Sequence, residues 1–135
     1  MQNRYARDDV QPMNWEESVQ WMRARPDMRA SVLASYYDDP LLGSAQRYSE
    51  SEEWKAILQY LPNGPGARAL DVGAGRGIAS FALAKNGFEV TALEPDDSEL
   101  VGAAAIRSLA RESRLPIRVV QGLSEDLPLG SDEFD

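Results

Sequence analysis

The chain contains neither cysteine nor histidine among its 135 residues. Without cysteine it forms no disulfide and no thiolate metal site, which fits a cytoplasmic protein. Without histidine, a reaction that needs a histidine base must take it from elsewhere. Basic residues are also few, since 14 Lys and Arg stand against 22 Asp and Glu, and the net charge is −8. Because such a charge does not attract phosphate backbones, we expect no nucleic-acid partner.

Long apolar runs are missing as well, so we expect no membrane-spanning segment. The chain opens on the polar stretch MQNRYARDD, which lacks the pattern of a secretory signal peptide. We find no repeat, no low-complexity tract and no spacing typical of metal ligands. We therefore expect a cytoplasmic protein that has no metal site and does not associate with a membrane.

The most informative stretch is ALDVGAGRG, residues 69–77, where a short apolar run ends in Asp71. Residues 78–87 follow with apolar side chains at helical spacing and a glycine after the last turn. The order strand, glycine loop, helix lets the backbone approach a polar ligand closely. The glycines of the loop stand at alternate positions: Gly73, Gly75 and Gly77.

The spacing of these glycines separates two classes of ligand. The dinucleotide fingerprint has glycine at its first, third and sixth positions. Counting from Gly73, this chain has glycine at the first, third and fifth positions, and Ile78 stands sixth. The acidic Asp71 would also repel a pyrophosphate, whereas it suits a ligand that presents an ammonium group. A nicotinamide-dependent oxidoreductase is therefore the weaker alternative.

This block resembles motif I of the class I S-adenosylmethionine-dependent methyltransferases. In that family the acidic residue holds the methionine end of the cofactor, and the glycines let the chain pass close to it. The resemblance implies that Asp71 and the three glycines bind S-adenosylmethionine.

The next segments agree with this interpretation. Residues 88–94 alternate in polarity and predict a second strand that ends in Glu94. A carboxylate about twenty residues after the loop accepts both hydroxyls of a ribose, in nicotinamide proteins and in S-adenosylmethionine proteins alike. We expect a helix to start next, with Asp96 and Glu99 as its capping box. Its apolar stripe would be Leu100, Val101, Ala104, Ala105 and Leu109.

Residues 117–121 predict a third strand, and the following GLSEDLPLGSDEFD is similar to the segment found there in methyltransferases of the ubiquinone-biosynthesis type. In the family an acidic residue after the glycine commonly contacts the adenine amino group, but here Leu123 takes that position. The backbone amide of Ser124 can still contact the ring. Glu125 is a candidate substitute, the alternative being a solvated loop acid.

Residues 1–66 predict three helices. Asn14 and Glu17 form a capping box for the first, Pro26 starts a second that extends to residue 37, and Ser51 opens a third over residues 52–61. By analogy with the family, this segment folds over the cofactor mouth and lines the acceptor pocket. The alternative is that its aromatic residues only pack the helices onto the sheet. The candidate lid residues are Tyr36, Tyr37 and Tyr48.

Together these segments predict an α/β fold: a Rossmann-like, doubly wound parallel sheet, represented by strands one to three, preceded by an α-helical N-terminal segment. Right-handed crossovers give the strand order three, two, one. We expect a helical lid over residues 1–66 and an incomplete S-adenosylmethionine-binding domain over residues 67–135. The uncovered edge of strand one is then a candidate surface for self-association.

The resemblance implies transfer of a methyl group to an oxygen, nitrogen or carbon atom of a small-molecule acceptor. The alternative is a non-catalytic fragment that binds a cofactor or a partner, because a complete domain of the family is longer than this chain. No catalytic residue is assigned, since methyl transfer rests largely on positioning an in-line attack. The residues that usually choose the acceptor are expected beyond residue 135.

Overall fold

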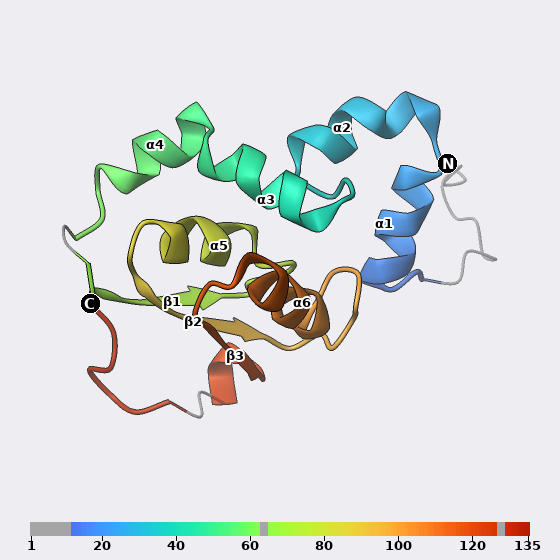
Figure 1. The fold of residues 1–135 in the computed structure, drawn as a ribbon. Helices are drawn as coiled ribbons and strands as arrows, with labels where there is room; N and C mark the ends of the chain where they lie inside the picture. The colour runs from blue at the N-terminus through green and yellow to red at the C-terminus, as the bar shows by residue number, and fades with distance from the viewer. Residues whose placement is uncertain (1–11, 63–64, 127–128) are drawn as a thin grey trace, which may run out of the picture.

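The computed structural model describes residues 12–62, 65–126 and 129–135 (Figure 1). Within these residues, four α-helices precede the first strand: α1 (Trp15–Arg23), α2 (Arg29–Ala34), α3 (Leu41–Ser49) and α4 (Glu52–Leu58), with the 3₁₀ helix η1 (Pro26–Met28) after α1. The second half of the chain forms β1 (Arg68–Val72), α5 (Ile78–Lys85), β2 (Glu89–Glu94), α6 (Ala103–Ser113), β3 (Ile117–Gln121) and the 3₁₀ helix η2 (Ser124–Asp126).

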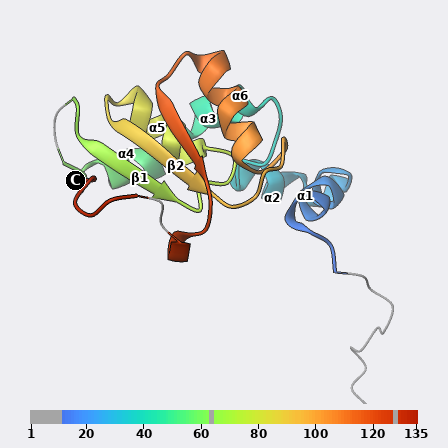
Figure 2. The same cartoon turned by 90° about the horizontal axis from the view of Figure 1, so that it is seen from below.

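The three strands form a parallel sheet in the order β1-β2-β3. In the register of β1 and β2, Arg68 lies opposite Glu89 and Val72 opposite Leu93. Because both crossovers run in the same direction along the sheet, right-handed connections place α5 and α6 on one face. Figure 2 shows the strands in front of these two helices when the molecule is seen from below. The predicted α/β fold, with a parallel sheet behind N-terminal helices, is confirmed.

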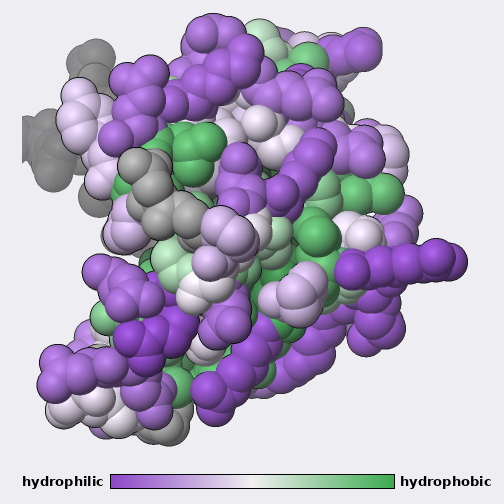
Figure 3. All heavy atoms as spheres, turned by 60° about the vertical axis from the view of Figure 1, so that its left-hand side comes forward, coloured by the Kyte–Doolittle hydropathy of each residue, from purple (hydrophilic) through white to green (hydrophobic). Residues whose placement is uncertain are grey.

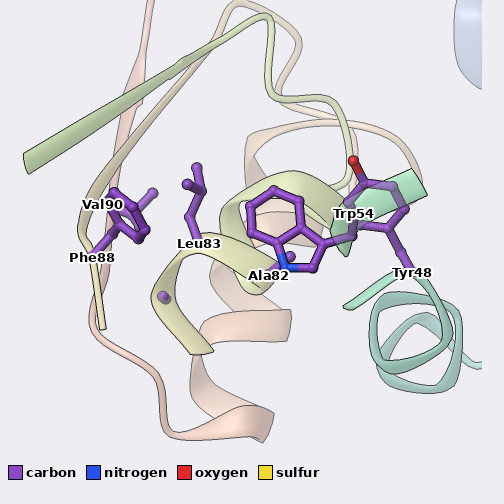
Figure 4. Packing of buried hydrophobic residues seen from close by; sticks show 7 residues of the cluster. Tyr48, Trp54, Ala82, Leu83, Phe88 and Val90 are labelled. Carbon is purple, nitrogen blue, oxygen red and sulfur yellow. The ribbon is translucent and has the colours of Figure 1, made fainter. Parts of the chain in front are cut away.

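The main hydrophobic core joins the N-terminal helices to the sheet. Tyr48 of α3 and Trp54 of α4 belong to the same buried cluster as Leu83 of α5 and Val90 of β2 (Figure 4). Fully burying a large apolar side chain contributes about 1.5–3 kcal/mol, so this cluster is a major source of stability. The helices before residue 66 and the sheet after it therefore share one core.

Two of the predicted helix starts are confirmed by their capping contacts. At α1, the Asn14 side chain accepts the Glu17 N–H at 2.8 Å, and the Glu17 carboxylate accepts the Asn14 N–H at 2.9 Å. At α4, the Ser51 hydroxyl accepts the Trp54 N–H at 3.1 Å. Each contact satisfies an amide that the first turn of a helix leaves without an intrahelical partner.

The predicted start of the helix after β2 is wrong. The helix α6 begins at Ala103, and its N-cap is Gly102. The Ser98 N–H donates to Asp96 Oδ1 at 2.9 Å, and Ser98 Oγ accepts the Leu100 N–H at 3.0 Å, so these side chains fold the segment into turns instead of a helix. The capping box of Asp96 and Glu99 is therefore not formed.

The N-terminal helices also differ from the prediction in extent and number. The helix α2 ends at Ala34, because Tyr36 adopts a φ of 60°, which a right-handed helix does not allow. The helix α4 ends at Leu58. The helix α3 was not predicted, although apolar residues recur along it at helical spacing: Leu41, Leu42, Ala45 and Tyr48.

Over the described ranges, the helices are too short or too polar for any of them to cross a bilayer. The same ranges hold no group of three or more His, Cys, Asp or Glu side chains placed to bind a metal ion.

Candidate functional site

The glycine loop, residues 73–77, follows β1 at the carboxyl edge of the sheet, where open parallel sheets bind their ligands (Figure 1). Its three glycines have positive φ values of 66°, 58° and 86°. A residue with a side chain costs roughly 1–2 kcal/mol in this left-handed region. The alternating glycines are therefore required by the path of the backbone itself.

Amide hydrogens of the glycine loop are engaged within the protein. The N–H groups of Gly73 and Ala74 both donate to the Leu93 carbonyl, at 2.9 and 3.1 Å. The N–H of Gly75 donates to Glu94 Oε2 at 2.6 Å. A pyrophosphate site needs such N–H groups pointed at the ligand. These three N–H groups are therefore not available to the pyrophosphate of the nicotinamide dinucleotide that the sequence left as an alternative.

A cleft of about 270 Å³ lies between the glycine loop and the turn that follows α2. It is only slightly smaller than pockets that take small molecules, which span about 300–1,000 Å³. The cleft brings together six of the predicted site residues from three separate parts of the chain: Tyr36, Tyr37, Tyr48, Asp71, Gly73 and Gly75. The predicted lid tyrosines and the predicted cofactor residues thus line one site.

Asp71 provides the carboxylate of this cleft. Its Oδ2 accepts the hydroxyl proton of Ser80, the third residue of α5, at 2.7 Å. Burial raises the pKa of Asp71 and the nearby Glu94 adds to the rise, while the hydrogen bond from Ser80 opposes it. A carboxylate in this position gains stability from a cation, and the tyrosine rings around it attract positive charge as well.

Space for a ligand lies beside two of the glycines and not beside the third. A Cβ built on Gly73 or Gly75 meets no protein atom within 4 Å. A Cβ on Gly77 comes within 3.0 Å of Ile106 Cγ2 on α6, and Gly77 is buried. The structure thus places Gly77 where α5 packs against α6, outside the residues that line the cleft.

Glu94 lies at the end of β2, immediately beside the glycine loop. Its side chain is 7% exposed, and its two carboxylate oxygens accept N–H groups from two loops. One is the Gly75 N–H at 2.6 Å, and the other is the Asp96 N–H at 3.1 Å. Glu94 therefore connects the loop after β2 to the glycine loop. Ribose hydroxyls would donate to a carboxylate that already accepts two N–H groups.

The two residues predicted to contact adenine lie farther away. Ser124 and Glu125 belong to η2, which follows β3, and both are exposed. Neither lines the cleft. Their contact with adenine stays a prediction.

Arg76 is a residue of the site that the sequence analysis missed. It stands between Gly75 and Gly77, lines the cleft, and is 3% exposed. Its guanidinium pairs with Asp39 at 2.8 Å, from a segment 37 residues earlier in the chain. The sequence does contain a signal for this role, namely a long charged side chain inside a tight glycine loop. Where another segment covers the loop, such a side chain is buried and needs polar partners in that segment.

Two other hollows formed by the described residues contain none of the predicted site residues. One, of about 720 Å³, lies beside Arg68, Glu89, Arg118 and Phe134. Another, of about 330 Å³, lies beside β1, where Leu70, Leu83 and Phe134 are among its lining. Figure 3 turns the C-terminal side of the molecule forward and shows hydrophobic residues exposed between hydrophilic ones. The cleft at the glycine loop is thus the hollow that carries the predicted chemistry.

The sheet, the glycine loop after β1, and the acidic residues at or near the ends of β1 and β2 define a Rossmann-like cofactor-binding fold of class I. Residues 70–135 match the family model described as a methyltransferase domain. This segment therefore matches a methyltransferase domain, and the resemblance seen in the sequence to methyltransferases of class I is confirmed.

Curated relatives carry the same family name. The ubiquinone biosynthesis O-methyltransferase of Xanthomonas campestris pv. campestris is 42% identical over 66 residues, which are 47% of this chain and 27% of the relative. An uncharacterized methyltransferase of Synechocystis is 39% identical over 79 residues, which are 58% of this chain and 34% of the relative. The chain thus spans about a third or less of the length of these relatives.

Solved structures show the same fold. The YcgJ protein of Bacillus subtilis superposes with a TM-score of 0.53 and 25% identity, over 60% of this chain and 34% of that chain. The PH0226 protein of Pyrococcus horikoshii OT3 gives a TM-score of 0.55 over 86% of this chain and 48% of that chain. At 19% identity, this second likeness shows the fold alone.

Proposed function

We propose that the protein transfers a methyl group from S-adenosylmethionine to a small-molecule acceptor. The observation that carries the proposal is the cleft in which the Asp71 carboxylate meets the glycine loop and three tyrosines. Membership of residues 70–135 in a methyltransferase family supports the reaction type.

The residues of the cleft fit the amino-acid end of the cofactor. The Asp71 carboxylate would hold the ammonium group. Burial has raised the pKa of this carboxyl, so its charged form gains from a cation that takes the place of the lost water. The open space beside Gly73 and Gly75 would take the methionine chain. Glu94 would bind the ribose, and the segment with Ser124 and Glu125 would approach the adenine.

When bound, S-adenosylmethionine supplies a methyl group that is already electrophilic, because it is carried by a sulfonium. The task of this chain is therefore to bind the cofactor, to orient it toward the acceptor and to exclude water. Tyr36 and Tyr48 are suited to this role, since their rings pack edge to face at 5.1 Å along the cleft. The relatives that are named O-methyltransferases support an oxygen atom as the acceptor nucleophile.

The uncovered edge of β1 stays a proposed surface for self-association. At the start of this strand, the Asp135 N–H donates to the Arg68 carbonyl at 2.9 Å, and Asp135 Oδ2 accepts the Arg68 N–H at 2.9 Å. Asp135 thus already pairs with the first residue of the edge, and a partner strand would pair with the residues that follow.

Calorimetric titration of the chain with S-adenosylhomocysteine, with NADH as the comparison ligand, tests the cofactor. We expect heat of binding for the first ligand alone. Asp71→Asn keeps the shape of the side chain and still accepts the Ser80 hydroxyl, but it removes the charge. Loss of a charge-assisted hydrogen bond costs about 1.5–3 kcal/mol, so affinity for S-adenosylhomocysteine should fall roughly ten- to a hundredfold.

Asp27→Asn is the matched control, because Asp27 is an exposed acid that pairs with Arg25 away from the cleft. It should bind S-adenosylhomocysteine like the wild type. Equal affinity of Asp71→Asn and the wild type would refute the ammonium role of Asp71. A folded wild-type chain that binds NADH and not S-adenosylhomocysteine would refute the proposed cofactor.

A further inference from the structure

We propose that Arg76 is a positioning residue that couples the glycine loop to the tyrosine turn, residues 35–39. In this arrangement the guanidinium holds Tyr36 and Tyr37 over the cleft, so that binding at the loop and closure of the turn favour each other. The inference rests on the proposed function for the identity of the ligand alone. The contact itself is visible in the protein without any ligand.

The geometry of the Arg76 side chain carries the argument. Its Nη1 donates to the carbonyls of Tyr36 and Asp38, at 2.9 and 3.0 Å. Its Nη2 donates to Asp39 Oδ1 at 2.8 Å. One planar guanidinium thus bonds three acceptors in four consecutive residues, which fixes the path of that turn more tightly than a single ion pair does.

The path of the turn carries an energetic cost at Tyr36. Tyr36, the second residue of the turn, has a φ of 60°, a region that a tyrosine occupies at an energetic cost. The Tyr36 carbonyl is one of the groups that Arg76 binds. The guanidinium is therefore placed to stabilise a backbone conformation that points two tyrosines at the cleft.

The other end of Arg76 belongs to the glycine loop. Its neighbours in the chain, Gly75 and Gly77, both have positive φ, and the Gly75 N–H is held by Glu94. A ligand that orders this loop also orders the backbone from which Arg76 extends. Because the side chain is 3% exposed, it cannot swing into solvent without opening the cover of the cleft.

The charges around Arg76 are only partly balanced. Burial lowers the pKa of Arg76, and the charge of Arg23 lowers it further, while Asp39 and Asp38 oppose both effects. Arg23 shares Asp39 with Arg76, donating to its other carboxylate oxygen at 2.8 Å. In the described part of the chain, Arg76 Nε has no hydrogen-bond partner. Such an incompletely satisfied buried cation is stabilised by any acceptor that completes it.

Arg47 provides a natural comparison, because it also binds the tyrosine turn. It binds Asp38 at 2.7 Å and the Leu33 carbonyl at 2.9 Å, but it comes from α3 and has no contact with the glycine loop through its side-chain hydrogen bonds. Arg47 therefore holds the turn to α3, whereas Arg76 holds it to the loop. Comparing their variants separates stability of the turn from coupling to the loop.

Hydrogen exchange of the full chain tests the coupling. The amides of Tyr36 and Tyr37 donate to the carbonyls of Leu33 and Val32, so their exchange reports on opening of the turn. In Arg76→Gln without ligand, we expect these amides to exchange at least tenfold faster, while the amides of β2 keep their wild-type rates. Arg25→Gln, which removes an exposed arginine outside the turn, should leave the turn amides unchanged.

Ligand linkage gives the readout that a merely structural role would not move. In the wild type and in Arg47→Gln, saturating S-adenosylhomocysteine should slow exchange of the turn amides. In Arg76→Gln it should protect the glycine loop but no longer the turn, and affinity should fall about tenfold. Arg76→Lys, which keeps the charge and not the fork, should recover part of the protection.

Two results would overturn the proposal. One is unchanged exchange of the turn amides in Arg76→Gln without ligand. The other is equal protection of the turn by ligand in Arg76→Gln and in the wild type. Should Arg76→Gln not fold, Arg76→Lys and Asp39→Asn take its place, and wild-type exchange in both would refute the coupling. Absence of S-adenosylhomocysteine binding by the wild type would refute the proposed cofactor, while the measurements without ligand still decide the role of Arg76.

Discussion

Gly77→Ala tests whether the third glycine of the loop serves packing or ligand space. The new Cβ lies 3.0 Å from Ile106 Cγ2 and 3.3 Å from Ile106 Cγ1, at a backbone φ of 86°. The left-handed conformation costs about 1–2 kcal/mol for alanine. Crowding of a packed core adds about 1–3 kcal/mol. We expect the free energy of unfolding to fall by about 2–5 kcal/mol.

Gly73→Ala is the matched control, because its φ is 66° and its Cβ meets no protein atom within 4 Å. It should show the conformational cost of about 1–2 kcal/mol without the crowding. The difference between the two variants is therefore the contact with Ile106. Urea unfolding, followed by tryptophan fluorescence, measures both free energies from the transition midpoint and slope.

A double-mutant cycle isolates this contact. Ile106→Ala removes both Cγ atoms and, as Ile106 is fully buried, costs about 2–5 kcal/mol by itself. In the double variant the crowding disappears, so the combined loss should be smaller than the sum by about 1–3 kcal/mol. Additivity of the two losses, or a Gly77→Ala loss no larger than that of Gly73→Ala, would refute the reasoning.

Two further predictions concern stability. Because burial raises the pKa of Asp71 above 3.8, the folded state binds this proton more tightly than the unfolded chain; the resulting stabilisation is fully present below the unfolded pKa and is lost as pH rises through the folded pKa. Asp71→Asn should therefore weaken the dependence of stability on pH, and at neutral pH it should unfold at a higher urea concentration than the wild type. The same change of the urea midpoint with pH in both proteins would contradict this. Ser51→Ala removes the acceptor of the Trp54 N–H at 3.1 Å and should lower the free energy of unfolding by about 1 kcal/mol, with Ser49→Ala, whose hydroxyl caps no helix start, as the control.

The sheet and its loop could be predicted because their signals are local. The apolar residues before Asp71, the alternation before Glu94 and the glycine spacing each depend on neighbours in the chain. The same holds for the capping contacts of Asn14 and Ser51, which reach three residues ahead. Such patterns carry the fold class and the place of the cleft.

The remaining features depend on contacts that no local pattern contains. The start of α6 was misjudged because Asp96 and Ser98 side chains compete with the helix for the backbone, and because Gly102 lets the chain pass close to the Asp96 carbonyl. The helix α3 was missed because Gly43 disfavours a helix and Ser44 places a polar side chain among its buried residues, where the Ser44 hydroxyl donates to Asp38 at 3.1 Å.

The role of Arg76 could not be deduced for a related reason. Its three acceptors lie 37 to 40 residues earlier in the chain, and two of them are backbone carbonyls, which leave no trace in the side-chain sequence. Likewise, Glu94 accepts the Gly75 N–H from 19 residues earlier in the chain, and this backbone donor leaves no trace in the sequence.

The shared core of α3, α4 and α5 defines which pieces of this protein can be exchanged between relatives. Tyr48 and Trp54 belong to the same buried cluster as Leu83 and Phe88, although the glycine loop separates the two pairs in the sequence. A chimera joined at residue 66 would therefore pack the N-terminal helices of one protein against the sheet of another, although their core residues do not match. Because Tyr36 also packs against this core, the unit of recombination extends from the tyrosine turn through β2, and the cover of the cleft and the glycine loop are inherited together.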